Sequence, residues 1–503
     1  MKLATLDRLR ASRRRQPASR WRFVGLVAGV LLAATSWFCG ALPADRPPVW
    51  PGIEPWRSVG GSPLAATVLF AALGVMLYAW WALRDAEVTV PWLRGTAFAW
   101  FGPLVLSAPL FSRDIYSYAV QGLMLHEGLD PYSQDVAALD SPWAASAPAT
   151  TTPAPYGPLF LQVARLAASV SMGHLLAAVF LLRLLAVAGV VLIAWAVPVI
   201  ARRLGVDPVR PTWLVVACPL LGVHLVSGGH NDALLVAGLL GGVALTLSGR
   251  PGLGVLAVAL ATTTKAPAAV VVPFVALLWA SHRAPQRQVT WARLVSRVVL
   301  AGLAVVGVVI GVSLALGLGL SWLTTLGSPG QSVQWTSAPT AWGMAVRSIA
   351  SLLGVASAGS AVPLFRAMGL LLLAPTLVGL WLYAAAHLRD RRLVVLSAGL
   401  AVLAVIVLAP SFRPWYVLWA LPLLAAATRA RRALTAYAVV ASVLASAVLP
   451  GGYSLALTTT AVGVPLMVVT TAVLAVRAAR WVRHHPWRQA FTLVDETSLL
   501  PDR

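Results

Sequence analysis

The sequence predicts an all-α protein that crosses a membrane about fourteen times and carries short helices in one long outer loop. Hydrophobic residues make up 59% of its 503 residues, charged residues make up only 11%, and the mean hydropathy is +0.81. A soluble globular chain needs a larger charged surface than this. Apolar runs of about 20 residues, the length that spans a bilayer, recur along the chain, and arginines cluster between them.

The spans are expected to form one transmembrane domain, residues 23–476, between a basic cytoplasmic tail, residues 1–22, and a second cytoplasmic tail, residues 477–503. The first apolar run is too long for a signal peptide, which favours a retained helix. In chain order the expected spans are 23–42, 63–83, 95–111, 174–200, 209–226, 231–248, two short spans within 252–281, 292–319, 363–387, 393–410, 414–428, 433–449 and 453–476.

Charge resolves two ambiguous segments, because basic residues collect on the cytoplasmic side of membrane proteins. This rule favours two short spans that meet at Lys265 over one broken span in 252–281, and a membrane-edge helix over a full span at 158–171. With both termini cytoplasmic, only nine of the 38 basic residues lie outside or within the membrane. The loop 112–156, which holds five of the sixteen acidic residues, then lies outside. Catalysis is expected in this loop.

The pattern of the sequence argues against several classes of protein. The net charge of the chain is +22, but its basic residues do not form one basic domain or an aromatic groove for nucleic acid. No glycine-rich loop for a nucleotide phosphate occurs, and no pair of matching broken helices suggests a secondary transporter. Cys39 and Cys218 both lie in apolar segments and predict neither a disulfide nor a metal cluster.

The candidate catalytic residue is Asp114, which follows Arg113 where the third predicted helix reaches the outer surface. A partly desolvated carboxylate there suits a general base that takes a proton from a hydroxyl nucleophile, while a neighbouring cation keeps it ionised. An ordinary ion pair at a helix end is the alternative. The loop tyrosines suit sugar rings or the membrane interface, and they are Tyr116, Tyr118, Tyr132 and Tyr156.

A second candidate group joins two predicted spans in a short outer turn. His230, Asn231 and Asp232 concentrate three hydrogen-bonding side chains where a bilayer offers few partners. A helix N-cap explains one of them but not all three, so we expect them to contact substrate. His224, inside the preceding helix, is expected to be a packed histidine.

Lys265 is the third candidate, because only it and Lys2 are lysines among 38 basic residues. The short run before it predicts that its ammonium lies below the outer surface, where a lipid phosphate is a natural partner. Snorkelling to the interface is the alternative.

The segment 411–416 is the fourth candidate. Its Arg413 is expected to assist Lys265 on a phosphate, and Trp415 and Tyr416 suit either an aromatic membrane belt or a platform for sugar. The loop 322–347 is expected to form a lid over this region.

Taken in order, these motifs resemble those of the actinobacterial polyprenyl-phosphomannose-dependent alpha-1,6-mannosyltransferases of the GT-C superfamily. They are RDIYSYAVQGLMLHEGLDPYS, PAPYGPLF, GGHNDALL, TKAP and SFRPWY, and they extend from about residue 111 to 416. The resemblance implies a GT-C-like fold, a polyprenyl-phosphate-mannose donor and a mannan or lipomannan acceptor at the outer face of the plasma membrane.

The resemblance also implies inversion at the anomeric carbon, with Asp114 as the base that deprotonates the acceptor 6-hydroxyl. Lys265 and Arg413 would hold the departing phosphate, and His230, Asn231 and Asp232 would contact sugar or phosphate. The further candidates for contact with the donor phosphate or the substrate are Arg113, Tyr116, Tyr156, Trp415 and Tyr416. Such a reaction requires no metal or other cofactor, because cations can neutralise the phosphate leaving group. The loop acids would also suit a divalent cation, but nothing in the sequence requires one.

Two alternatives stay open from the sequence. A flippase or transporter of a lipid-linked sugar would also need recessed charges and many spans. A GT-C transferase for another sugar, such as arabinofuranose or glucose, would use the same arrangement.

Overall fold

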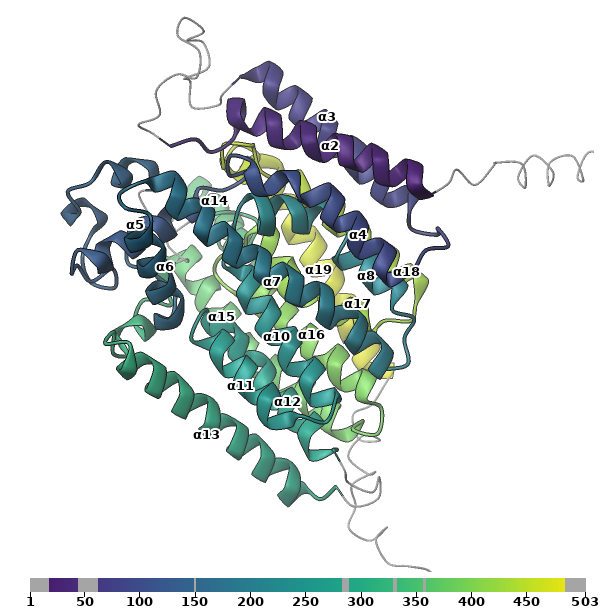
Figure 1. Ribbon diagram of the computed structural model, residues 1–503. Helices are drawn as coiled ribbons and strands as arrows, with labels where there is room; N and C mark the ends of the chain where they lie inside the picture. Colours follow the sequence, from purple (N-terminus) through teal and green to yellow (C-terminus); the bar gives the residue numbers. More distant parts are fainter. Residues whose placement is uncertain are drawn as a thin grey trace, which may run out of the picture.

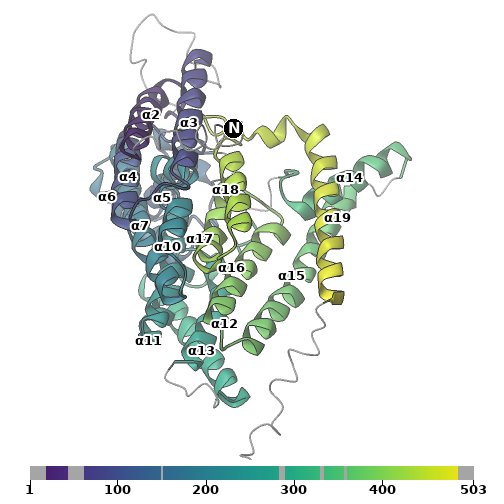
Figure 2. The same ribbon diagram turned by 90° about the vertical axis from the view of Figure 1, so that its right-hand side faces the viewer.

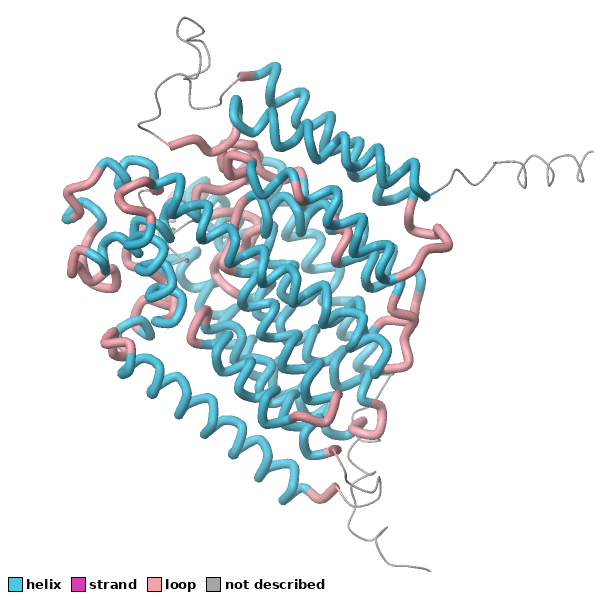
Figure 3. Tube along the Cα trace, in the orientation of Figure 1, coloured by secondary structure: helices cyan, strands magenta, loops and turns pink. Residues whose placement is uncertain are grey.

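The computed structural model is a bundle of helices over the residues that it describes, which are 18–43, 62–148, 151–282, 289–328, 333–355 and 359–484. The connecting loops gather mainly at the two ends of the bundle (Figure 3). Within these ranges, extended pairing is limited to an isolated bridge between Val448 and Ser454. The all-α prediction is confirmed.

Seven helices of the described chain are long and apolar enough to cross a bilayer, and a bent pair, α8 (Val209–Val215) with Pro219–Ser227, gives an eighth. The seven are α2 (Ala18–Cys39), α3 (Pro63–Ala82), α7 (Leu175–Arg203), α13 (Trp291–Ala315), α15 (Ala361–Ala386), α16 (Arg391–Leu408) and α19 (Thr460–His484). Shorter apolar helices are α6 (Pro158–Val170), α10 (Asp232–Leu247), α11 (Pro251–Thr262), α12 (Val272–Ala280) and α17 (Val417–Ala427). Each predicted span contains helix, while the count of fourteen crossings stays a prediction.

Some helix boundaries differ from those expected. Helix α2 extends from Ala18, inside the predicted basic tail, and its Arg22 packs against a neighbouring helix. Its Nε donates to Thr96 Oγ1 at 2.9 Å, and its guanidinium lies 4.0 Å from the Trp92 ring centroid on α4 (Val90–Phe101). At the other end, α19 continues to His484. Helix α14 (Ala338–Leu352) occupies part of the segment expected to be a lid.

The segment around Lys265 folds as a helical hairpin. Helix α11 ends at Thr262, and the chain reverses through a 3₁₀ turn, η6 (Ala266–Val271), before α12 begins. The start of α11 and the end of α12 lie together, because Pro251 and Trp279 line the same cavity. The prediction of two short helices meeting at Lys265 is therefore confirmed over one continuous helix.

The long loop forms a helical cap at one end of the bundle (Figure 1). Helix α5 (Asp114–His126) leads into two 3₁₀ turns, η3 (Val136–Ala138) and η4 (Pro142–Ser146), and then into α6. Helices α5 and α6 pack closely because Gly122 has no side chain. A Cβ at this position would meet the Ala164 carbonyl group.

The C-terminal helices complete the bundle. Helix α17 packs against α16, α10 and α7, so a late segment of the chain lies beside the central helices. Helices α14, α15 and α19 stand together to one side (Figure 2), and α18 (Arg431–Ala445) lies nearer the centre.

Candidate active site

Four segments that are distant in sequence meet at the end of the bundle that carries the loop 112–156. They are the first turn of α5, the turn 228–231 before α10, the bend at Lys265 and the 3₁₀ turn η10 (Pro414–Tyr416). Each segment places a helix end or a tight turn here. The polar side chains predicted from three separate motifs therefore come into contact.

The centre of the site is a buried ion pair between Lys265 and Asp232. Lys265 Nζ lies 2.9 Å from Asp232 Oδ1 and 3.5 Å from Asn231 Oδ1. The Trp419 indole N–H donates to the same Asp232 oxygen at 2.6 Å. Asp232 is the first residue of α10, where the helix dipole stabilises an anion. The Lys265 ammonium therefore already has a counter-ion within the protein.

Three aromatic rings surround the Lys265 ammonium. The ring centroids of Tyr416 and Trp419 lie 5.3 Å from Nζ, and that of Tyr156 lies 5.5 Å away. Aromatic faces attract a cation most strongly when water is excluded. These contacts fix the ammonium deep in the site rather than letting it extend to the surface.

His230 lies between two carboxylates. Its Nδ1 is 3.5 Å from Asp114 Oδ2 and 4.0 Å from Asp232 Oδ2. The Trp415 ring stacks on the imidazole with centroids 3.9 Å apart. His230 therefore connects Asp114 to the buried Lys265–Asp232 pair.

Asp114 is the accessible member of this group. Its side chain is 34% exposed, whereas the side chains of His230 and Asp232 are fully buried. Its backbone N–H is held by Ser112 Oγ at 3.1 Å, which fixes the start of α5. A substrate hydroxyl can reach this carboxylate without entering the buried part of the site.

The segment 411–416 lies against the same cluster. Trp415 is buried, and Tyr416 stacks on Trp419 with centroids 4.2 Å apart, so both rings pack within the site instead of forming a lipid-facing belt. The Arg413 guanidinium lies within electrostatic reach of His230 and Tyr416. It is partly exposed and makes no hydrogen bond or ion pair with any residue that the structure describes.

Arg113 and Tyr116 make contacts that order the outer loops. The Arg113 guanidinium donates to the Ser146 carbonyl at 2.9 and 3.1 Å and to the Leu42 carbonyl at 3.0 Å. The Tyr116 hydroxyl donates to the Ala41 carbonyl at 2.7 Å. Both side chains tie the start of α5 to neighbouring chain segments, and their contact with substrate stays a prediction.

Tyr132 supports Tyr156 from the loop. Its hydroxyl donates to the Tyr156 carbonyl at 3.0 Å. Burial, together with the nearby Asp130 carboxylate, raises the pKa of the Tyr132 phenol above its ordinary value, so the group remains a hydrogen-bond donor. The backbone of Tyr156 is thereby held beside the Lys265 ammonium.

Arg183 is a structural support that sequence reasoning did not identify as part of the site. This buried arginine of α7 donates to the carbonyls of Val105, Ser107 and Ser227 at 3.0, 2.7 and 2.9 Å. Ser227 ends a π-helical turn, η5 (Gly222–Ser227), just before the turn that carries His230. π-Helical turns are frequent at functional sites. An intramembrane arginine is the sequence signal that identifies this position.

Trp419 was also missed, and the contact of the predicted loop tyrosine Tyr118 with Asn231 was not foreseen. The Tyr118 hydroxyl lies 3.4 Å from Asn231 Oδ1, and Trp419 bonds Asp232 as described above. Trp419 is one of 21 tryptophans, so composition does not single it out. Its position one helical turn after Trp415 and Tyr416 is the available signal.

Several buried polar atoms of the cluster lack a hydrogen-bond partner among the described residues. They are both ring nitrogens of His230, Nδ2 of Asn231, Oδ2 of Asp232 and Nε1 of Trp415. Most buried polar groups in proteins are hydrogen-bonded. This concentration of donors and acceptors suits a polar ligand.

An apolar groove adjoins the polar cluster. It has a volume of about 420 Å³ and is lined by α6, α7, α10 and α11. Its lining begins at Phe160 and Thr264, next to Tyr156 and Lys265, and follows α10 from Leu234 to Leu245. This length of helix is about 16 Å at 1.5 Å per residue. The groove can hold a long hydrocarbon chain whose polar end lies at the cluster.

The described residues contain no group of three or more His, Cys, Asp or Glu side chains arranged to hold a metal ion. Independence from a metal or other cofactor nevertheless stays a prediction.

Comparison with known families identifies the kind of enzyme. Residues 22–281 match the family profile described as "Alpha-(1->6)-mannopyranosyltransferase, N-terminal domain", and residues 339–480 match that of the "MptB C-terminal domain". This chain belongs to the alpha-(1->6)-mannopyranosyltransferase family. It is a membrane-embedded glycosyltransferase that transfers mannose to an alpha-1,6 acceptor, as the resemblance of its motifs predicted. The assignment favours the transferase over the flippase and over transferases for other sugars.

Curated relatives agree with this assignment. The chain is 32% identical over 425 residues to "Alpha-(1->6)-mannopyranosyltransferase A" of Mycobacterium tuberculosis, covering 82% of this chain and 81% of the relative. It is 30% identical over 438 residues to "Alpha-(1->6)-mannopyranosyltransferase B" of Corynebacterium glutamicum, covering 80% and 71%. No solved structure matches the chain.

The cluster is shared between the two matched segments. Asp114, His230 and Lys265 lie in the first segment, while Arg413 and Trp419 lie in the second. The candidate site of this alpha-(1->6)-mannopyranosyltransferase therefore combines residues from both segments.

Proposed function

We propose that this mannosyltransferase takes its mannose from a polyprenyl phosphate and transfers it, with inversion, to the 6-hydroxyl of a mannan or lipomannan acceptor at the outer face of the plasma membrane. The observation that carries the proposal is the apolar groove that ends at the polar cluster. A donor that combines a long hydrocarbon chain with a phosphate-linked sugar matches both parts. A water-soluble nucleotide sugar would use only the polar one.

Asp114 is the general base in this proposal. Its carboxylate accepts the proton of the acceptor 6-hydroxyl while that oxygen attacks the anomeric carbon of the donor mannose. The new glycosidic bond forms as the bond between the anomeric carbon and the phosphate oxygen breaks. The leaving polyprenyl phosphate keeps the bonding electrons, and one displacement inverts the configuration. The partial exposure of Asp114 supports this role, because the acceptor arrives from water.

Arg413 neutralises the phosphate in this proposal, because its guanidinium is partly exposed and has no described ion-pair partner. Arginine binds phosphate oxygens through two parallel N–H donors. Lys265 assists from below, but its charge is shared with Asp232. His230 and Asn231 supply further hydrogen-bonding groups toward the sugar or the phosphate.

The base assignment is tested with purified protein, labelled polyprenyl phosphomannose and a defined alpha-1,6-mannoside acceptor. Asp114→Asn should lower the transfer rate by about 10² to 10⁴-fold, the usual contribution of a general base. Glu127→Gln is the matched control, because this exposed carboxylate follows the other end of the same helix. Full activity of Asp114→Asn would remove Asp114 from the mechanism.

The same assay tests the donor and the stereochemistry. Labelled mannose should be transferred from the polyprenyl phosphate and not from a nucleotide sugar. NMR of donor and product should show opposite anomeric configurations. Transfer from the nucleotide sugar alone would exclude the proposed donor, and equal configurations would exclude a single displacement.

A further inference from the structure

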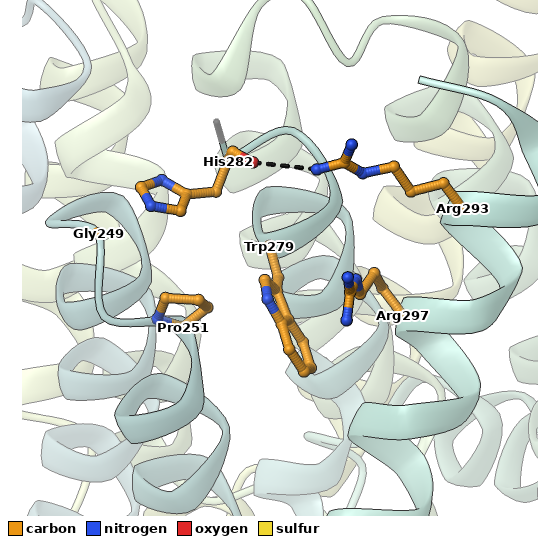
Figure 4. A pocket seen from close by; sticks show the side chains of 6 residues that line it. All are labelled: Gly249, Pro251, Trp279, His282, Arg293 and Arg297. Atoms are coloured by element: carbon orange, nitrogen blue, oxygen red, sulfur yellow. Dashed lines mark hydrogen bonds between the residues drawn. The ribbon is translucent and has the colours of Figure 1, made fainter. Parts of the chain in front are cut away.

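A second polar cavity lies at the end of the bundle opposite the candidate active site. It has a volume of about 330 Å³ and is lined by Gly249, Pro251, Trp279, His282, Arg293 and Arg297 (Figure 4). Pro251 begins α11, and Lys265 follows the end of this helix. Twelve helical residues separate the two sites by about 18 Å. The catalytic proposal uses none of the residues that line this distal cavity.

The charge of the distal cavity is positive. Arg293 and Arg297 extend from the first turns of α13, toward the end of α12 (Figure 4). Arg293 Nη2 donates to the His282 carbonyl at 3.2 Å, and the Arg297 guanidinium lies 4.8 Å from the Trp279 ring centroid. None of the described residues that line the cavity is acidic. Among these residues the two guanidinium groups have no carboxylate as a counter-ion.

The arginine side chains are not simply extended into water. The Nε atoms of Arg293 and Arg297 are buried and lack a hydrogen-bond partner among the described residues. Two donors that are withdrawn from water and left unpaired favour an acceptor. A phosphate group supplies several acceptor oxygens together with the compensating charge.

The surface of the bundle around the distal cavity is apolar. Leu253 and Leu256 on α11 are exposed, as are Val295 and Val299 on α13. Only 17% of the residues in the most apolar part of helix α13 are buried within the protein, which leaves most of this part available to contact lipid. The cationic cavity thus lies where an apolar surface ends.

We propose that the distal cavity binds the phosphate of an anionic membrane lipid, in the leaflet opposite the candidate active site. The arginines bind the headgroup phosphate, Trp279 packs against the glycerol region, and the acyl chains cover the exposed side chains of α11 and α13. A soluble anion would use the charge but leave the apolar surface uncovered. The lipid also joins α12 to α13, a helix that the protein itself buries little. This inference is independent of the proposed donor and base.

The full chain, purified in neutral detergent, is tested by native mass spectrometry with short-chain phosphatidylglycerol, short-chain phosphatidylcholine and inorganic phosphate as probes. Phosphatidylglycerol should bind more strongly than phosphatidylcholine. Arg293→Gln/Arg297→Gln should bind it at least about tenfold more weakly, because charge-assisted hydrogen bonds are lost. Arg391→Gln, an exposed arginine at the start of α16, is the matched control and should bind as the unaltered chain does.

The variants must be folded, and mannose transfer at the other end of the bundle reports this. Arg293→Lys/Arg297→Lys keeps both charges and should bind phosphatidylglycerol more tightly than the glutamine variant. Equal binding of phosphatidylglycerol and phosphatidylcholine would overturn the proposal, as would unchanged binding by an active glutamine variant. Displacement of the lipid by equimolar inorganic phosphate would assign the cavity to a soluble anion instead.

Discussion

Replacing Lys265 by methionine tests the buried ion pair at the centre of the site. The variant Lys265→Met fills a similar volume but removes the ammonium that lies 2.9 Å from Asp232 Oδ1. The Asp232 carboxylate is fully buried and keeps only the Trp419 N–H on that oxygen. Removing one partner of a buried pair costs about 3–5 kcal/mol, because the other charge is left uncompensated.

Replacing Asp232 by asparagine should lower the free energy of unfolding less than Lys265→Met does. Asp232→Asn leaves an amide oxygen for the ammonium, and Lys265 keeps Asn231 and its three aromatic rings. The Lys265 side chain is also 11% exposed, so its charge retains some access to solvent. We expect a loss of about 1–3 kcal/mol, the cost of weakening a hydrogen bond to a charged group. The double variant should recover much of the loss caused by Lys265→Met, because it leaves no buried carboxylate.

The free energy of unfolding is measured by denaturation in mixed micelles for the unaltered chain, the two single variants and the double variant. A double-mutant cycle then gives the interaction free energy between Lys265 and Asp232. A coupling below about 0.5 kcal/mol would refute the reasoning. So would a Lys265→Met chain that is more stable than Asp232→Asn. Circular dichroism before denaturation checks that each variant has native helix content.

Two further substitutions probe the packing around the site in the same assay. Trp419→Phe keeps a ring beside Lys265 but removes the N–H donated to Asp232. The free energy of unfolding should fall by about 1–3 kcal/mol. An unchanged free energy of unfolding would contradict this hydrogen bond. Gly122→Ala places a Cβ against the Ala164 carbonyl and should cost about 1–3 kcal/mol. Its control, Gly74→Ala, meets no atom within 4 Å and should be neutral or stabilising, and equal losses would argue against close packing of α5 and α6.

Local composition was sufficient to find the residues that form the core of the site. Lys265 stood out because it is one of two lysines, and the distribution of basic residues predicted the two short helices that meet at it in the structure. His230, Asn231 and Asp232 stood out because an apolar chain rarely places three polar side chains in one turn. The choice of these side chains depended on local composition, whereas the two short helices followed from the placement of basic residues along the chain.

The partners of these residues were harder to predict, because they come from distant segments. The sequence favoured a lipid phosphate as the counter-ion of Lys265, whereas the structure places Asp232 there, 33 residues earlier in the chain. Arg113 adjoins Asp114 in sequence, yet its guanidinium bonds to the backbone of two other loops. Neighbouring positions in a chain do not determine where long side chains point once loops pack over them.

The Asp232 carboxylate contacts both Lys265 and Trp419, which has a consequence for how the enzyme is synthesised and folded. Membrane proteins are synthesised from the N-terminus, so Asp232 and Lys265 enter the bilayer well before Trp419 is translated. The ion pair can then form between α10 and the hairpin while α17 is still missing. The last hydrogen bond to Asp232 closes only when α17 arrives. A nascent chain that has stopped short of this helix would hold a charged but unfinished pocket, so transfer of mannose should begin only after nearly the whole protein has been inserted.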